Sequence, residues 1–206
     1  MTKTVIRSPW FLWTLVTSIG SAVGFTIGGS LGGFFSDYYL PLFILVTFAI
    51  CCLFMSFGQW MILRTKLTRA WGWMPATTFG LPLGFFIGFW VNEFLPRSLY
   101  VNEWIETWIM AGIAGVFTGL IQWLTLRRKL KDSLKWILMS ALSWAVGINV
   151  TGFLFETYLS NLDFWYLNAS ISGLIIGALV GILSGVFVES TLMQTEHNGI
   201  LQDHAS

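Results

Sequence analysis

Charged side chains are scarce in this sequence. Only 10% of its 206 residues are Asp, Glu, Lys or Arg, whereas 55% are hydrophobic, and a soluble domain usually carries about a quarter charged residues. The scarcity is uneven, because some long stretches contain no charge at all: residues 8–36, 38–63, 70–92, 107–126, 136–155 and 164–188. This composition excludes an ordinary soluble domain.

Histidine and cysteine are also rare, which removes most catalytic and metal chemistry. The only histidines, His197 and His204, lie near the C-terminus, and the only cysteines, Cys51 and Cys52, are adjacent. Neither pair has the spacing of a metal site or of a disulfide framework. The apolar stretches contain no H-E-x-x-H motif and no serine–histidine pairing. We therefore predict that the protein is not an enzyme and holds no cofactor or metal.

Each charge-free stretch is long enough to cross a membrane as a helix. About 20 helical residues span a hydrocarbon core of roughly 30 Å, and backbone groups in lipid must be satisfied within the helix itself. The stretches are apolar on all sides, unlike the alternating strands of a barrel. The sequence predicts an all-α integral membrane protein with six transmembrane helices at Trp10–Phe35, Leu40–Leu63, Trp73–Phe94, Trp104–Leu126, Leu134–Leu159 and Trp165–Val188.

Two local features complete this outline. Pro82 lies inside the third helix and is expected to bend it, because proline removes a backbone hydrogen bond. The chain becomes polar from Glu189 onward. We predict one transmembrane domain over residues 1–190 and a mobile, polar cytoplasmic tail over residues 191–206.

The basic residues are sorted to one side of the membrane. Of the 11 Lys and Arg, only Arg97 falls on the side that carries most of the acidic residues. The others precede the first helix or lie between the second and third or the fourth and fifth helices. The positive-inside rule then places both termini in the cytoplasm. The predicted location of the protein is the inner (plasma) membrane. Membrane insertion explains this distribution of basic residues, so nucleic-acid binding is not expected. The predicted partner is the lipid bilayer.

One motif occurs twice along the chain. Residues 59–67 and 122–130 both read Q-W-x-x-L-R-x-K-L. The same register continues without a gap, so that Trp73 matches Trp136 and Glu93 matches Glu156. Self-similarity at a fixed period indicates a duplicated structural unit.

The first, third and fifth helices share a further pattern, a tryptophan followed by small residues at +4, +7, +11 and +15. The predicted fold is therefore three two-helix hairpin repeats, at about residues 9–70, 71–132 and 133–190. A two-helix unit returns to its starting side, so the copies are parallel repeats about an axis along the membrane normal. A pseudo-threefold ring is the simplest arrangement, and a less regular bundle is the alternative. The third copy lacks the Gln-Trp ending, since Val188 stands where glutamine is expected.

Glycines at four-residue spacing predict close helix packing. Their missing side chains allow two backbones to approach, which holds helices together in lipid through van der Waals contact. Packing within the chain is the simpler interpretation, and contact with a membrane-protein partner is the alternative. The glycines in question are Gly20, Gly24, Gly28, Gly32, Gly80, Gly84, Gly88, Gly173, Gly177, Gly181 and Gly185.

The repeated motif combines an interface anchor with a hydrogen-bonding residue. Its tryptophan and arginine lie one turn apart, where an indole and a guanidinium suit the lipid headgroup region. Its glutamine lies just inside, where an amide can bond to a neighbouring helix. A cytoplasmic-side ligand site is the alternative. These residues are Gln59, Trp60, Arg64, Gln122, Trp123 and Arg127.

Glu93 and Glu156 are equivalent in the repeat and lie at the outer ends of their helices. Carboxylates near the lipid boundary indicate function when they face inward. One hypothesis is that the two act together at an outward-facing polar site. The other is that both are solvated surface carboxylates.

The repeated Q-W-x-x-L-R ending, with W-x-x-x-T/S-x-x-G-x-x-x-G on the following helix, resembles a group of bacterial polytopic membrane proteins. Their two-helix hairpins carry similar GxxQWLxLRR repeats, and the resemblance covers the first five helices. It implies no activity, because none is established for that group.

Two functional classes remain open. The first is a non-enzymatic interaction or scaffold protein, or an accessory subunit of a membrane complex. The second is a transporter component. Six helices and cytoplasmic termini look like the substrate-binding subunits of energy-coupling-factor vitamin transporters, which dock their partner through small-xxx-small stripes on the first helix. Those subunits do not usually contain a triplicated hairpin. The sequence leaves the oligomeric state undetermined.

Overall fold

The computed structural model describes residues 8–36, 40–65, 67, 70–96, 103–127, 133–159 and 165–203. Every regular element in these ranges is helical, as the sequence predicted. The long helices are α2 (Pro9–Ser36), α3 (Leu40–Leu63), α4 (Trp73–Phe94), α5 (Glu103–Leu126), α6 (Lys135–Leu154) and α7 (Trp165–Asp203). A 3₁₀ turn, η1 (Ala70–Gly72), precedes α4, and a π-helical turn, η3 (Phe155–Leu159), follows α6.

The chain is a multi-pass membrane protein by the length and composition of its helices. All 6 long helices are long and apolar enough to cross a bilayer. Large apolar side chains lie exposed along them, among them Leu15 on α2, Phe79 on α4 and Leu138 on α6. Such an extensive apolar exterior is suited to lipid rather than to water.

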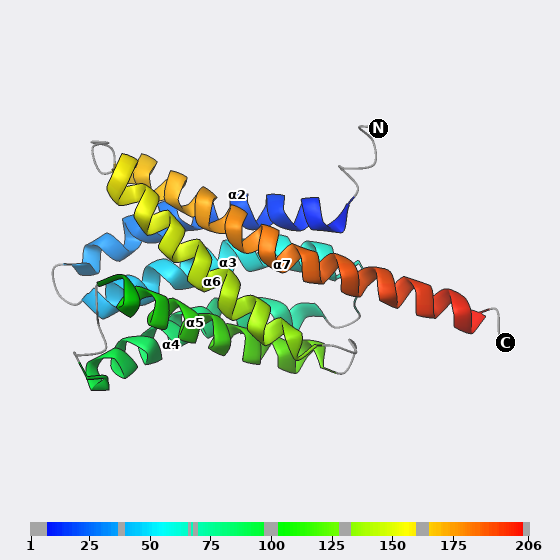
Figure 1. Ribbon diagram of the computed structural model, residues 1–206. Coiled ribbons are helices and arrows are strands. Elements are labelled where there is room, and N and C mark those ends of the chain that lie inside the picture. The colour runs from blue at the N-terminus through cyan, green and yellow to red at the C-terminus, as the bar shows by residue number, and fades with distance from the viewer. Residues whose placement is uncertain are drawn as a thin grey trace.

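Two predicted helix ends differ from the structure by more than one residue. α6 ends at Leu154, and the last residues of the predicted helix form the π-helical turn η3. α7 continues as one helix to Asp203 and projects beyond the other helices (Figure 1). The segment predicted as a polar tail over residues 191–206 is therefore helical as far as Asp203. Hydropathy reports where a helix leaves the lipid, whereas backbone hydrogen bonds can continue into a polar stretch whose residues, such as Glu, Gln, Leu and Met, favour the helix.

Pro82 does not interrupt its helix, because α4 is continuous from Trp73 to Phe94. Many of the loop and terminal charges lie outside the described residues, namely Lys3, Arg7, Asp37, Lys66, Arg69, Arg97, Arg128, Lys129, Lys131, Asp132 and Asp163.

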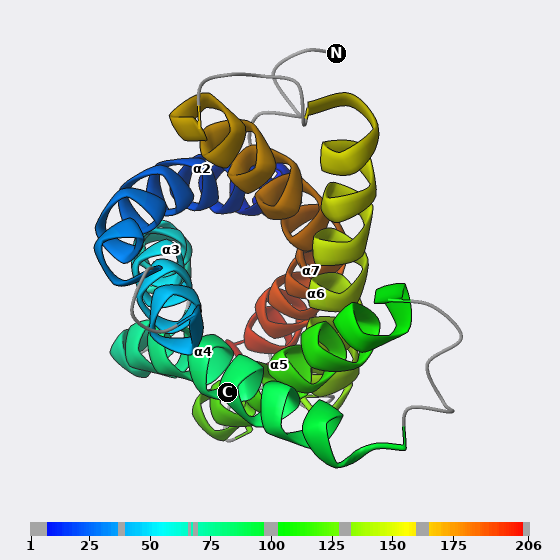
Figure 2. The ribbon, with the colours of Figure 1, turned by 90° about the vertical axis from the view of Figure 1, so that its left-hand side faces the viewer.

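The helices form a closed ring in chain order. Each packs against the next along the chain, and α7 packs against α2. Figure 2, which looks along the ring, shows them around a common axis. This ring is compatible with three hairpins about one axis, and the repeat itself stays a prediction. We call the end where α3 and α5 finish the basic end and the opposite end the acidic end.

The axis of the ring is filled by side chains. One buried cluster occupies the basic end and includes Trp13, Trp73, Trp136 and Val188. A second cluster continues toward the acidic end and includes Met55, Phe85, Trp144 and Val180, with Phe48 stacked on Phe85. The ring therefore has a packed core.

The glycine stripes lie where neighbouring helices of this chain touch. A Cβ atom added to Gly24 would stand 2.4 Å from Cys51 Cα on α3, and one added to Gly84 would stand 2.5 Å from Ala114 Cα on α5. At Gly177 the nearest atom is the carbonyl oxygen of Thr17 on α2, at 2.6 Å. These glycines thus permit backbone-to-backbone packing inside the ring. A membrane-protein partner that used the same stripes would have to displace a helix of the chain itself.

Candidate functional site

A belt of buried polar side chains crosses the ring near its basic end. Gln59 on α3 is only 3% exposed. Its Nε2 donates to Thr17 Oγ1 on α2 over 3.0 Å, and its Oε1 accepts from Trp73 Nε1 on α4 over 2.9 Å. One side-chain amide thereby links three consecutive helices.

The second glutamine repeats this arrangement one hairpin further along. Gln122 Nε2 donates to Thr77 Oγ1 over 2.7 Å, and Gln122 Oε1 accepts from Trp136 Nε1 over 2.7 Å. Gln122 therefore joins α4, α5 and α6 as Gln59 joins α2, α3 and α4. The sequence predicted that each amide bonds to a neighbouring helix, and each bonds to two.

The threonines determine which way each amide points. Thr17 Oγ1 donates its proton to the carbonyl of Trp13 over 2.7 Å, and Thr77 Oγ1 donates to the carbonyl of Trp73 over 2.9 Å. A hydroxyl has one donor, so each threonine oxygen can only accept from the glutamine. The amide nitrogen must then face the threonine and the amide oxygen the indole N–H.

The third sector of the belt is built differently. Trp13 Nε1 donates to Ser184 Oγ on α7 over 2.9 Å, and Ser184 Oγ donates to the carbonyl of Val180 over 2.6 Å. Val188, one turn beyond Ser184, is 6% exposed and belongs to the apolar core. Ser184, one turn before Val188, thus accepts the hydrogen bond from the Trp13 indole that a glutamine at position 188 would accept.

The three indoles meet on the axis. The ring centroids are 5.7 Å apart for Trp13 and Trp73, 5.3 Å for Trp73 and Trp136, and 6.4 Å for Trp13 and Trp136. All three side chains are at most 3% exposed. We call this set the tryptophan layer. It fills the axis at the basic end with two edge-on contacts and one tilted contact, and aromatic pairs of this kind add stability beyond their buried area.

A small cavity lies beside the tryptophan layer, within the ring. It has a volume of about 10 Å³, which is the room needed for about one water molecule. Its wall combines apolar side chains with the polar groups of Gln59, Gln122, Ser140, Ser143 and Ser184. We call it the central cavity.

Comparisons with protein-family models, curated proteins and solved structures find no match for this chain.

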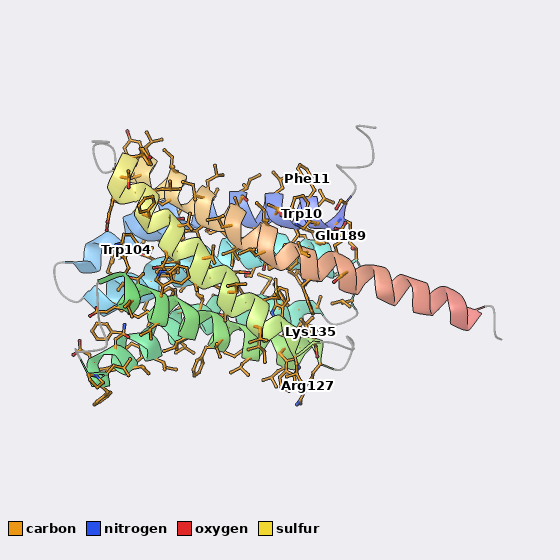
Figure 3. The ribbon with its side chains drawn as sticks, in the orientation of Figure 1. Trp10, Phe11, Trp104, Arg127, Lys135 and Glu189 are labelled. Carbon is orange, nitrogen blue, oxygen red and sulfur yellow. The ribbon has the colours of Figure 1, made fainter. Side chains whose placement is uncertain are left out.

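The repeated motif divides into an inner and an outer part. Trp60 and Trp123 each directly follow a buried glutamine in the sequence. Each also contacts an exposed arginine at the basic end. Arg64 lies over the Trp60 ring at 4.9 Å, and Arg127 lies over the Trp123 ring at 5.5 Å. Figure 3 labels Arg127 at this end of the ring. Successive helical residues point about 100° apart, so the motif bonds inward through glutamine and faces outward through arginine.

Sequence reasoning missed the partners of the glutamines. The repeat pattern includes Trp73, Trp136 and Thr17, the small residue at +4 from Trp13, only as equivalent positions, and Ser184 falls outside it. A signal was present, since α2, α4 and α6 each have a tryptophan in their N-terminal part and a threonine or serine one turn later. The distance of 14 residues from each glutamine to its tryptophan hid the pairing.

Glu93 and Glu156 are both exposed, on α4 and on the turn η3. Exposed carboxylates favour the solvated interpretation over a shared polar site, so we expect the effects of Glu93→Gln and Glu156→Gln on thermal stability to be additive. Thermal unfolding of the single and double variants in detergent measures this. A double variant that loses more than the sum of the singles would reveal a site in which the carboxylates interact.

Proposed function

We propose that this chain is a non-enzymatic protein of the inner membrane that acts as an interaction protein or accessory subunit of a larger membrane complex. The tryptophan layer carries the proposal. It fills the axis with hydrogen-bonded indoles, and the central cavity beside it is too small for a solute larger than water.

The burial pattern gives further support. Among the described residues, the buried polar side chains are hydroxyls and amides such as Thr118 and Asn149, with no Asp, Glu, Lys, Arg or His. Ionisable side chains inside the membrane usually mark ion and substrate pathways. A ring with a packed interior free of ionisable side chains is better suited to presenting a lipid-facing surface to another membrane protein.

A transporter component is the second candidate, and the position of the central cavity inside the ring, rather than its present volume, favours it. Transporters built from repeats bind their substrate near the repeat axis. The cavity would then be the occluded remnant of a larger site that opens to one side at a time.

Access of water to the cavity separates these two candidates without knowledge of a substrate. Ser184→Cys and Ser143→Cys each place a thiol on the cavity wall. An accessory subunit is expected to protect both from small water-soluble thiol reagents applied to either side of the membrane. Tyr158→Cys, which is at an exposed position, is the positive control. Reaction of the cavity thiols from each side in turn would support the transporter instead.

Orientation is tested with the same chemistry. We expect Thr65→Cys, in the exposed turn after α3, to resist an impermeant thiol reagent in intact cells and to react once the cells are opened. Tyr158→Cys, 69% exposed at the acidic end, should react in intact cells. The native Cys51 and Cys52 are 0% exposed and give little background. The reverse labelling pattern would place the basic end outside.

A further inference from the structure

We propose that the central cavity is a binding site for one water molecule, which takes the place of the amide that the third sector lacks. The inference concerns the closed ring and is independent of the choice between accessory subunit and transporter. It depends on the hydrogen-bond capacity of the cavity wall, on the cavity volume and on the position of Val188.

The two glutamines leave hydrogen-bond donors unused. A side-chain amide has two N–H donors. Within the described part of the chain, Gln59 uses one of them on Thr17 and Gln122 uses one on Thr77. Both glutamines line the central cavity. The cavity therefore adjoins two buried amides that can each donate once more.

The serines on the wall offer the complementary acceptors. Ser143 Oγ donates to the carbonyl of Met139 over 2.6 Å, which leaves its oxygen able to accept. Ser140 is 4% exposed. Its position in α6 is equivalent to that of Thr17 in α2 and of Thr77 in α4, four residues after the tryptophan. Those threonines face a glutamine amide, whereas the corresponding residue for Ser140 is the apolar Val188. The third sector thus retains the hydroxyl of the belt without the amide.

Water fits this wall better than an ion or an empty space. It accepts two hydrogen bonds and donates two, which matches two amide donors and two serine acceptors. A polar cavity of this size holds water, whereas empty cavities are apolar. An ion would be buried without an opposite charge, because the wall has no charged side chain, and such burial is strongly unfavourable.

A structure of the full chain in a lipid nanodisc or crystal, at a resolution that shows waters, tests the proposal directly. We expect one peak in the central cavity, within about 2.7–3.2 Å of a glutamine Nε2 and of a serine oxygen. An empty cavity would overturn the proposal. Crystals grown with bromide serve as the test for an anion, and an anomalous peak in the cavity would also overturn it.

The substitution Val188→Gln tests whether the water stands in for a third amide. The new side chain is expected to reach Ser140 and to remove the peak. Val188→Met is the matched apolar variant of similar length. We expect the melting temperature of Val188→Gln to exceed that of Val188→Met by about 3 °C, the shift that roughly 1 kcal/mol produces in a chain of this size.

Ile176 provides the control, since it is 5% exposed on the same helix and belongs to the apolar core. At this position we expect the melting temperature of Ile176→Gln to be lower than that of Ile176→Met, because burying an amide without hydrogen-bond partners is unfavourable. If glutamine is no better than methionine at position 188 as well, the third sector is an apolar site and the proposed role of the water is refuted.

Discussion

Gly24→Ala is expected to destabilise the ring severely, by about 3 kcal/mol, at the upper end of the usual cost of overpacking. The added Cβ would stand 2.4 Å from Cys51 Cα and 3.0 Å from the Cys51 carbonyl oxygen. Both obstacles are backbone atoms of α3, so no side-chain rotation relieves the clash. The helices α2 and α3 would have to separate along much of their length, because each is rigid.

Gly112→Ala is the matched control for this prediction. It makes the same chemical change within a long helix, α5, but a Cβ there meets nothing within 4 Å. Alanine is favoured over glycine inside a helix by about 1 kcal/mol, so this variant should be as stable as the native chain or slightly more so. Thermal unfolding in detergent compares the two. Equal stability of Gly24→Ala and Gly112→Ala would refute close backbone packing at Gly24.

Arg127→Ala provides a second comparison. The guanidinium is exposed and lies over the Trp123 ring, and an exposed contact of this kind contributes about 0.5–1 kcal/mol. A loss larger than that of Gly24→Ala would show that the basic end, rather than helix packing, stabilises the fold.

Gln122→Leu is expected to cost about 2 kcal/mol, the penalty for leaving a buried donor without a partner. Leucine has a similar volume but cannot accept from Trp136 Nε1, which Gln122 Oε1 accepts over 2.7 Å. Trp136 is 3% exposed, so bulk solvent does not reach its N–H to replace the lost bond. Thr77 keeps its own bond to the carbonyl of Trp73. The orphaned indole N–H therefore accounts for most of the loss.

A double-mutant cycle assigns this loss to the hydrogen bond. Trp136→Phe removes the indole N–H, so its cost should be smaller by about 1 kcal/mol in the Gln122→Leu background than in the native chain. Trp90→Phe, at a 45% exposed position on α4, should cost the same in both backgrounds. A cycle that is additive for Trp136 as well would mean that the amide stabilises the ring through packing alone.

Hydropathy was sufficient to predict the helices. The predicted third helix, Trp73–Phe94, has the bounds of α4, because a membrane leaves one backbone solution for a long charge-free stretch. Hydropathy failed for α7 beyond Glu189, where the helix continues as the side chains become polar. The end of a span and the end of a helix are different physical events, and composition reports only the first.

The glycine pattern predicted close packing, but the packing partner came from the fold. Nothing in the spacing of Gly173 and Gly177 indicates that they rest on α2, at the other end of the chain. A stripe of small residues predicts that the backbone of another helix approaches it closely. Ring closure, in which α7 meets α2, decides which backbone it is.

The sequence by itself determined a membrane protein of apolar helices, a repeated motif and a glutamine placed to bond between helices. These follow from composition and from spacing along one helix. Only the tertiary structure decided that Gln59 and Gln122 each join three helices, that Trp13, Trp73 and Trp136 meet on the axis, and that Ser184 substitutes in the third sector. These contacts join residues far apart in the chain, and a hydrogen bond forms only when the whole ring has brought donor and acceptor to within about 3 Å.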